Sequence, residues 1–125
     1  MPETFPAARR IRRRPEFQRA YEKGRRIHGR FMTVFFLRAD VPQSRLGVSA
    51  TRKLGGAVVR NRAKRRFREA FRRGQFPAGV DIVVIPRPAA LEAPFGEVAA
   101  ELQLLVARAA RAVRSGTATT PGRDA

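Results

Sequence analysis

A run of fourteen residues, 60–73, combines dense positive charge with a narrow apolar stripe, and it constrains the fold more than any other segment. The run holds eight cations and a single anion. Apolar residues in and just before it recur every three or four positions, the spacing that places side chains on one face of an α-helix. They are Val59, Ala63, Phe67, Ala70 and Phe71. The sequence therefore predicts a helix that is anchored along one face and presents cations over the rest of its surface.

The charge balance of the whole chain indicates a polyanionic partner. The net charge is +17 over 125 residues, and residues 45–73 hold eleven cations against one anion, whereas residues 74–125 hold five of each. Because such self-repulsion opposes folding, a counter-charged partner should stabilise the native state, and nucleic acid is the commonest partner of this kind. A membrane-surface protein is the alternative, but the narrow apolar stripe argues against it.

Length and composition narrow the class of protein further. A chain of 125 residues is about one domain, and the absence of cysteine excludes disulfides and thiolate metal sites. No apolar run is long enough to span a membrane, and the N-terminus lacks the apolar core of a secretory signal. We therefore expect a cytoplasmic protein with three parts: a flexible basic N-terminal arm over 1–14, a single α/β domain over 15–114, and a disordered C-terminal tail over 115–125.

The spacing of apolar residues and turn formers predicts an α+β fold. A short helix begins at Pro15 and ends at Gly24, where we expect a left-handed glycine. Further elements are strands over 31–38, 45–51 and 81–85 and a core helix over 94–113. The strand over 31–38 is apolar on both faces, whereas the sheet of a small domain usually packs only one face fully. Either one face forms part of a groove, or the short N-terminal helix covers it.

One face of the strand over 45–51 carries only small or polar side chains apart from Arg45, which predicts a shallow groove. If Phe31 and Phe35 lie beside that face, the groove gains stacking rings and becomes a platform for single-stranded nucleic acid. Phe17 and Tyr21 are four residues apart and share a helix face, so they either belong to the core or line this groove.

Residue types needed for catalysis are scarce. The single histidine, His28, has no carboxylate nearby in sequence, and the carboxylates Asp40, Glu69 and Asp81 are isolated from one another. We therefore expect no catalytic residue and no metal site in the protein itself.

The segment Gly55-Gly56-Ala57-Val58-Val59-Arg60-Asn61-Arg62-Ala63-Lys64-Arg65 resembles the signature of the bacterial ribonuclease P protein family. The resemblance extends upstream through 45–49 and Arg52-Lys53, and downstream through Arg68-Glu69 and 81–84. It covers residues 9–112.

This resemblance implies a two-layer α/β sandwich with a mixed four-stranded sheet and a left-handed βαβ crossover that contains the basic helix. It also implies a protein subunit that binds ribonuclease P RNA and precursor tRNA and promotes endonucleolytic removal of the 5′ leader. The RNA subunit performs the hydrolysis, with Mg²⁺ held mainly by RNA. A general RNA-binding module, such as a ribosomal protein or RNA chaperone, is the alternative, and a DNA-binding regulator is disfavoured because no helix-turn-helix pair precedes the basic helix.

The resemblance also assigns residues to two surfaces. The catalytic RNA is expected to contact Arg60, Asn61, Arg62, Lys64, Arg65 and Arg68. The leader is expected to lie in a cleft formed by Phe17, Tyr21, Phe35, Arg52 and Lys53. Neither a membrane nor a protein partner is expected.

Overall fold

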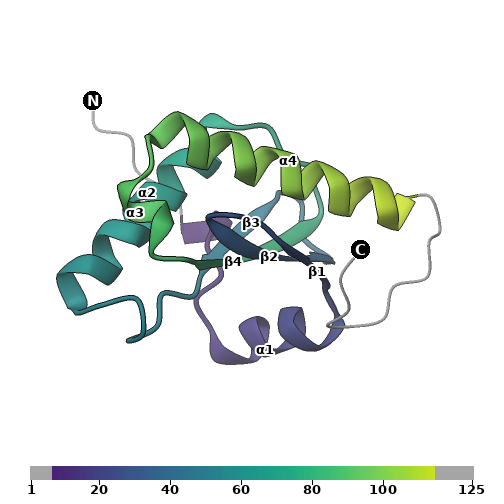
Figure 1. Cartoon of the computed structure of the whole chain (residues 1–125). Helices are drawn as coiled ribbons and strands as arrows, with labels where there is room; N and C mark the ends of the chain where they lie inside the picture. The colour runs from purple at the N-terminus through teal and green to yellow at the C-terminus, as the bar shows by residue number, and fades with distance from the viewer. Residues whose placement is uncertain (1–6, 115–125) are drawn as a thin grey trace.

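Four strands form one mixed sheet in the computed structural model, which describes residues 7–114 (Figure 1). The strands are β1 (Arg25–His28), β2 (Met32–Arg38), β3 (Arg45–Val48) and β4 (Val80–Pro86), in the spatial order β1-β2-β4-β3. The β1/β2 and β2/β4 pairs are antiparallel, and the β3/β4 pair is parallel. The α+β class and the mixed four-stranded sheet predicted from the sequence are confirmed.

Helices cover both faces of this sheet (Figure 1). On one face lie α2 (Ala57–Arg73) and α4 (Phe95–Arg114), with the short α3 (Ala89–Glu92) between β4 and α4. On the other face lies α1 (Arg14–Lys23), preceded by the 3-10 turn η1 (Ala7–Arg9). Among the described residues, no helix is long and apolar enough to cross a lipid bilayer.

The two faces of β2 pack into two separate apolar clusters. Met32, Val34 and Phe36 face the main core beneath α2 and α4, whereas Phe35 faces a smaller cluster beneath α1. Phe31 differs from the expectation: it lies in the main core and is not beside Phe35. It precedes the first residue of β2, so strict alternation does not extend to it.

The basic helix α2 is anchored through its predicted stripe. Ala63, Phe67, Ala70 and Phe71 are buried, and the stripe ends at the partly exposed Val59. Because β3 and β4 are parallel neighbours, the chain must cross over between them, and α2 forms that crossover. The helix therefore runs directly beside β3. Gly55 permits the sharp entry into α2, since its φ of 152° lies in a region that other residues rarely adopt.

The end of β3 and the conformation of Gly24 differ from the sequence prediction. Strand β3 ends at Val48 rather than at residue 51, after which the chain enters a turn. Gly24 does end α1, but its φ is −81°, so it is not left-handed. A side chain there would place its Cβ 2.5 Å from the carbonyl oxygen of Ala20, so close approach explains the glycine.

The folded domain also begins before residue 15. Residues 9–11, which the sequence assigned to a flexible arm, run along the edge of β3, and Ile11 is only 4% exposed. Burial of this one apolar side chain explains the attachment. Residues 1–6 of the proposed arm and residues 115–125, the proposed tail, lie outside the described residues.

Candidate nucleic-acid interface

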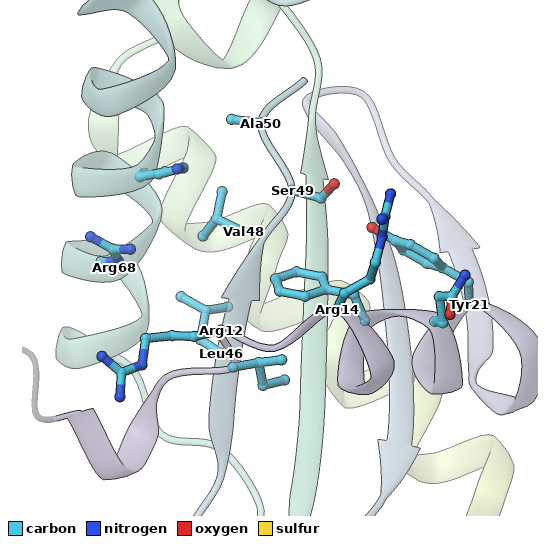
Figure 2. Close-up of a pocket in the computed structure, with 12 residues that line it drawn as sticks. Arg12, Arg14, Tyr21, Leu46, Val48, Ser49, Ala50 and Arg68 are labelled. Carbon is cyan, nitrogen blue, oxygen red and sulfur yellow. The ribbon is translucent and has the colours of Figure 1, made fainter. Parts of the chain in front are cut away.

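A cavity of about 710 Å³ opens between α1 and α2, with β3 as its floor (Figure 2). Leu46, Val48, Ser49 and Ala50 from β3 and the turn after it form the floor. The walls belong to two helices because α1 covers the β2 and β4 side of the sheet and α2 packs beside β3. We call this cavity the cleft. The groove was predicted on the face of 45–51 that carries Arg45, Gly47, Ser49 and Thr51, and of these residues only Ser49 lines the cleft. The other three floor residues belong to the opposite, apolar face.

Aromatic rings from α1 form one wall of the cleft. Phe17 and Tyr21 line it together with Gln18, and the two ring centroids are 6.4 Å apart. The Tyr21 and Phe35 rings pack in a T-shaped arrangement, with their centroids 5.0 Å apart and their planes at an angle of 69°. Phe35 is 6% exposed and does not line the cleft. It supports Tyr21 from behind, and its expected part in leader binding stays a prediction.

Cations form the other side of the cleft. Lys64 and Arg68 reach it from α2, and Arg12 reaches it from the segment that leads into α1. Arg14, the first residue of α1, lines the wall that carries the rings (Figure 2). Among the described residues that line the cleft there is no carboxylate. Burial, together with the nearby charge of Arg10, lowers the pKa of the Arg68 guanidinium. The cleft therefore offers rings on one wall and uncompensated positive charge on the opposite wall.

The solvent-facing side of α2 is a second cationic surface. Asn61 and Arg62 are exposed there, and Arg65 is exposed about one turn further along the helix. On the flank toward α3, Arg62 Nη2 donates a hydrogen bond of 3.0 Å to the carbonyl oxygen of Leu91, and Arg66 donates to that of Ala93. We call Asn61, Arg62 and Arg65 the outer face of α2.

The structure divides the six residues expected at a single surface. Asn61, Arg62 and Arg65 lie on the outer face, whereas Lys64 and Arg68 line the cleft. Arg60 sits at the helix start, where its Nη1 donates a 3.1 Å hydrogen bond to the Gly55 carbonyl oxygen. A 100° step per residue separates Lys64 from Arg65 around the helix, so neighbours in sequence face different surroundings.

The five residues expected in the cleft are also only partly brought together. Phe17 and Tyr21 line it, and Phe35 lies behind it. Arg52 and Lys53 are exposed in the turn that follows β3, beyond the floor residues Ser49 and Ala50, and do not line the cavity.

Sequence analysis missed several cleft residues. Arg12, Arg14 and Ile11 were assigned to a flexible arm, and Gln18 was not considered. The signal that could have found them is the isolated apolar Ile11 between Arg10 and Arg12. Burial of one apolar side chain ties its basic neighbours to the folded domain.

A network of ionic hydrogen bonds fixes α1 over the sheet and so sets the width of the cleft. Arg45 on β3 donates from Nε and Nη2 to the two carboxylate oxygens of Asp81 on β4, each at 2.8 Å. Its Nη1 donates to Glu16 of α1 at 3.2 Å. Asp81 is 1% exposed, and its hydrogen bond is the main cause of the raised pKa of Arg45. Arg45 therefore joins β3, β4 and α1 at the end of the cleft near Phe17.

Glu69 is held by two arginines of its own helix, which gives a prediction for acid stability. Hydrogen bonds from Arg72 at 2.6–3.0 Å, and one from Arg73 at 2.6 Å, lower the pKa of Glu69 from 4.5 to about 2. A carboxylate whose pKa is lower in the folded state stabilises the fold above its unfolded pKa. That contribution should be lost as the pH falls from about 4.5 toward about 2.

The expected result is that Glu69→Gln flattens the acid limb of a stability profile measured by urea unfolding. The effect should be small and weaken with added salt, because this carboxylate is 34% exposed. Glu92→Gln, at an exposed carboxylate on α3, is the matched control. An identical acid limb in wild type and Glu69→Gln would contradict the assignment.

The single histidine, His28, is paired with Thr33 across β1 and β2. His28 Nδ1 lies 3.0 Å from the hydroxyl of Thr33. Within residues 7–114 no three His, Asp or Glu side chains gather where they could hold a metal ion. The cleft and the outer face of α2 carry positive charge that a polyanion would complement.

Comparison with known proteins identifies similar chains. The family described as Ribonuclease P matches residues 5–110. A ribonuclease P protein component from Desulfovibrio desulfuricans is 45% identical over 86% of this chain and 87% of its own length, and one from Symbiobacterium thermophilum is 45% identical over 87% and 97%. Among solved structures, the RNase P protein of Thermotoga maritima superposes with a TM-score of 0.71 at 37% identity, covering 79% of this chain and 96% of that one. The RNase P protein of Staphylococcus aureus gives 0.69 at 33%, covering 81% and 96%.

Proposed function

Because the chain belongs to the ribonuclease P protein family, we propose that its two cationic surfaces bind two different RNAs. The protein is the non-catalytic subunit of an endoribonuclease that removes the 5′ leader from precursor tRNA, and the RNA subunit performs the hydrolysis. Within this assembly we assign the cleft to the single-stranded leader and the outer face of α2 to the ribonuclease P RNA.

The observation that carries the leader assignment is the asymmetry of the cleft. Single-strand binding surfaces combine a positive groove for the backbone with rings on which bases stack. Here Phe17 and Tyr21 form one wall, and Lys64 and Arg68 stand on the other. A strand in this cleft would direct its bases toward α1 and its phosphates toward α2. The floor of Leu46, Val48 and Ala50 has no group that would repel the strand.

The outer face of α2 suits a structured RNA. It is a rigid helix surface with the side chains of Asn61, Arg62 and Arg65 directed outward, and its anchored stripe keeps those side chains in a fixed array. Contacts of this kind go to phosphates and sugars and make binding strongly salt-dependent. Arg52 and Lys53, exposed beyond the floor of the cleft, lie where they could extend either contact.

Magnesium belongs to the RNA in this proposal. Mg²⁺ supplies the charge that activates water and stabilises the leaving oxygen during phosphodiester hydrolysis. Glu16 and Asp81 are held by Arg45, and Glu69 is held by Arg72 and Arg73, so these carboxylates are already engaged with cations. The protein's part is to position both RNAs, and a cytoplasmic location, where precursor tRNA is processed, goes with this role.

Reconstitution tests the function. The purified protein, added to a bacterial ribonuclease P RNA at low Mg²⁺ concentration, should restore cleavage of precursor tRNA at the 5′ end of the mature sequence. Binding to this RNA without stimulation of cleavage would favour a general RNA-binding module instead. Equal competition by duplex DNA would contradict both readings.

A pair of matched substitutions tests the aromatic wall. Tyr21→Leu should weaken binding of a leader-bearing precursor by about 1–3 kcal/mol, the usual worth of one stacked base. Phe35→Leu removes a ring of similar size from behind Tyr21 and should mainly lower the stability of the fold, by about 1 kcal/mol. Precursor affinity of the holoenzyme and urea unfolding of the protein distinguish the two. A larger loss of precursor affinity in Phe35→Leu than in Tyr21→Leu would place the strand elsewhere.

A further inference from the structure

The segment before α1 is fastened to the edge of the sheet by specific contacts. Arg9 donates from Nε to the Ser44 carbonyl oxygen at 3.2 Å and from Nη2 to Ser44 Oγ at 2.9 Å. Its guanidinium also lies 4.8 Å from the centroid of the Phe71 ring of α2. Two residues later, the Ile11 amide donates to the Leu46 carbonyl oxygen at 2.9 Å, and the Ile11 side chain is buried. This segment is therefore part of the folded domain.

This attachment brings Arg12 to the cleft. Arg12 follows Ile11 directly, and its side chain is exposed whereas that of Ile11 is buried. Arg12 lines the cleft together with Lys64 and Arg68 of α2. Figure 2 shows Arg12 extending from this segment toward α2, on the side of the cleft where Arg68 lies.

Arg12 lies far in sequence from Lys64 and Arg68 of α2, yet all three cations line the cleft. No carboxylate stands among the described lining residues to offset them. Burial and the neighbouring Arg10 lower the pKa of Arg68, as expected where positive charge is concentrated. Such an arrangement is unfavourable unless an anion occupies it. A phosphodiester matches it, because its oxygens accept several charge-assisted hydrogen bonds at once and guanidinium groups bind them two at a time.

We propose that Arg12, Lys64 and Arg68 form a clamp for one RNA phosphodiester group, and that Arg9 is a positioning residue that holds Arg12 in the clamp. This inference rests on the proposed function and names a third element, the segment 9–13, as a wall of the cleft. The phosphodiester can come from the leader or from the ribonuclease P RNA, and the chemistry of the clamp is the same for both.

The chain supplies a matched control for the clamp. Arg13 is adjacent to Arg12, carries the same charge and is exposed, but does not line the cleft. Three affinities are measured for each variant: protein for ribonuclease P RNA, holoenzyme for a precursor with a long leader, and holoenzyme for a precursor with a one-nucleotide leader. Each is measured over a range of salt concentrations.

Arg12→Ala should lower the affinity for the long-leader precursor about tenfold and reduce its salt slope by about 0.7, the value for one lost single-strand phosphate contact. Arg13→Ala should change it less than about twofold. A loss confined to the affinity for ribonuclease P RNA would assign the clamped phosphodiester to that RNA. Equal losses for Arg12→Ala and Arg13→Ala in all three affinities would overturn the clamp. Such a failure would leave stimulation of cleavage by the wild-type protein intact, so it is distinguishable from failure of the proposed function.

The role of Arg9 is tested by a double-mutant cycle. If Arg9 acts by holding Arg12, Arg9→Ala should lower long-leader affinity nearly as much as Arg12→Ala, and the double variant should be no weaker than Arg12→Ala alone. Additive losses would overturn the positioning role. Ser44→Ala, which removes only the hydroxyl that accepts from Arg9, should show a smaller loss of the same kind, and it keeps the test valid if Arg9→Ala folds poorly.

Discussion

Replacing Arg45 with methionine is expected to lower the free energy of unfolding by about 3–5 kcal/mol, the cost of removing one partner of a buried ion pair. Asp81 is 1% exposed, and Arg45 donates to both of its carboxylate oxygens at 2.8 Å. Without Arg45, this carboxylate is left buried beside an apolar chain that cannot solvate it. Denaturant unfolding of the isolated protein measures the loss.

Two control variants distinguish the buried Arg45–Asp81 pair from the more exposed Arg45–Glu16 pair. Replacing both partners, as Arg45→Met with Asp81→Leu, should recover most of the lost stability, because no uncompensated charge then remains. Glu16→Gln should cost less than about 1 kcal/mol, since the Glu16 side chain is 26% exposed and its hydrogen bond to Arg45 is longer. A double variant as unstable as Arg45→Met would show that the pair is not the source of the loss.

The position of Asp81 illustrates what sequence reasoning could not reach. The strand around it was predicted correctly, but its carboxylate was treated as isolated. Its partner, Arg45, lies 36 residues away, and the parallel register of β3 and β4 aligns the two residues directly. Register depends on how strands pair in space, which apolar periodicity along one strand does not encode.

The basic helix shows the opposite case, in which periodicity was enough. Apolar spacing predicted which side chains anchor α2, and four of the five are buried. Periodicity also indicated that cations cover the remaining surface. It could not show that α1 and the segment 9–13 stand opposite Lys64 and Arg68, while α3 stands beside Arg62. Those neighbours divide one basic helix into two surfaces, so a set of six residues that seemed uniform in sequence became divided in structure.

The division of α2 leads to the second large effect. Lys64→Ala combined with Arg68→Ala should lower holoenzyme affinity for a leader-bearing precursor roughly a hundredfold, because two charge-assisted contacts are worth about 1.5 kcal/mol each at the low end. Its affinity for ribonuclease P RNA should change only a few fold. The charge-matched pair, Arg62→Ala with Arg65→Ala, should give the reverse: weak assembly with a reduced salt slope and little dependence on leader length.

The two double variants remove the same charge from the same helix, so overall electrostatic attraction cannot distinguish them. Only the position of each side chain can distinguish them. Lys64 and Arg68 line the cleft, whereas Arg62 and Arg65 are exposed on the outer face. If both pairs weakened assembly equally and neither responded to leader length, the six residues would act as one docking surface, as the family resemblance alone suggests. If instead the first pair weakened mainly precursor binding and the second mainly assembly, one helix would contact both RNAs. The wall of the cleft would then face the substrate, and the outer face would face the catalytic RNA.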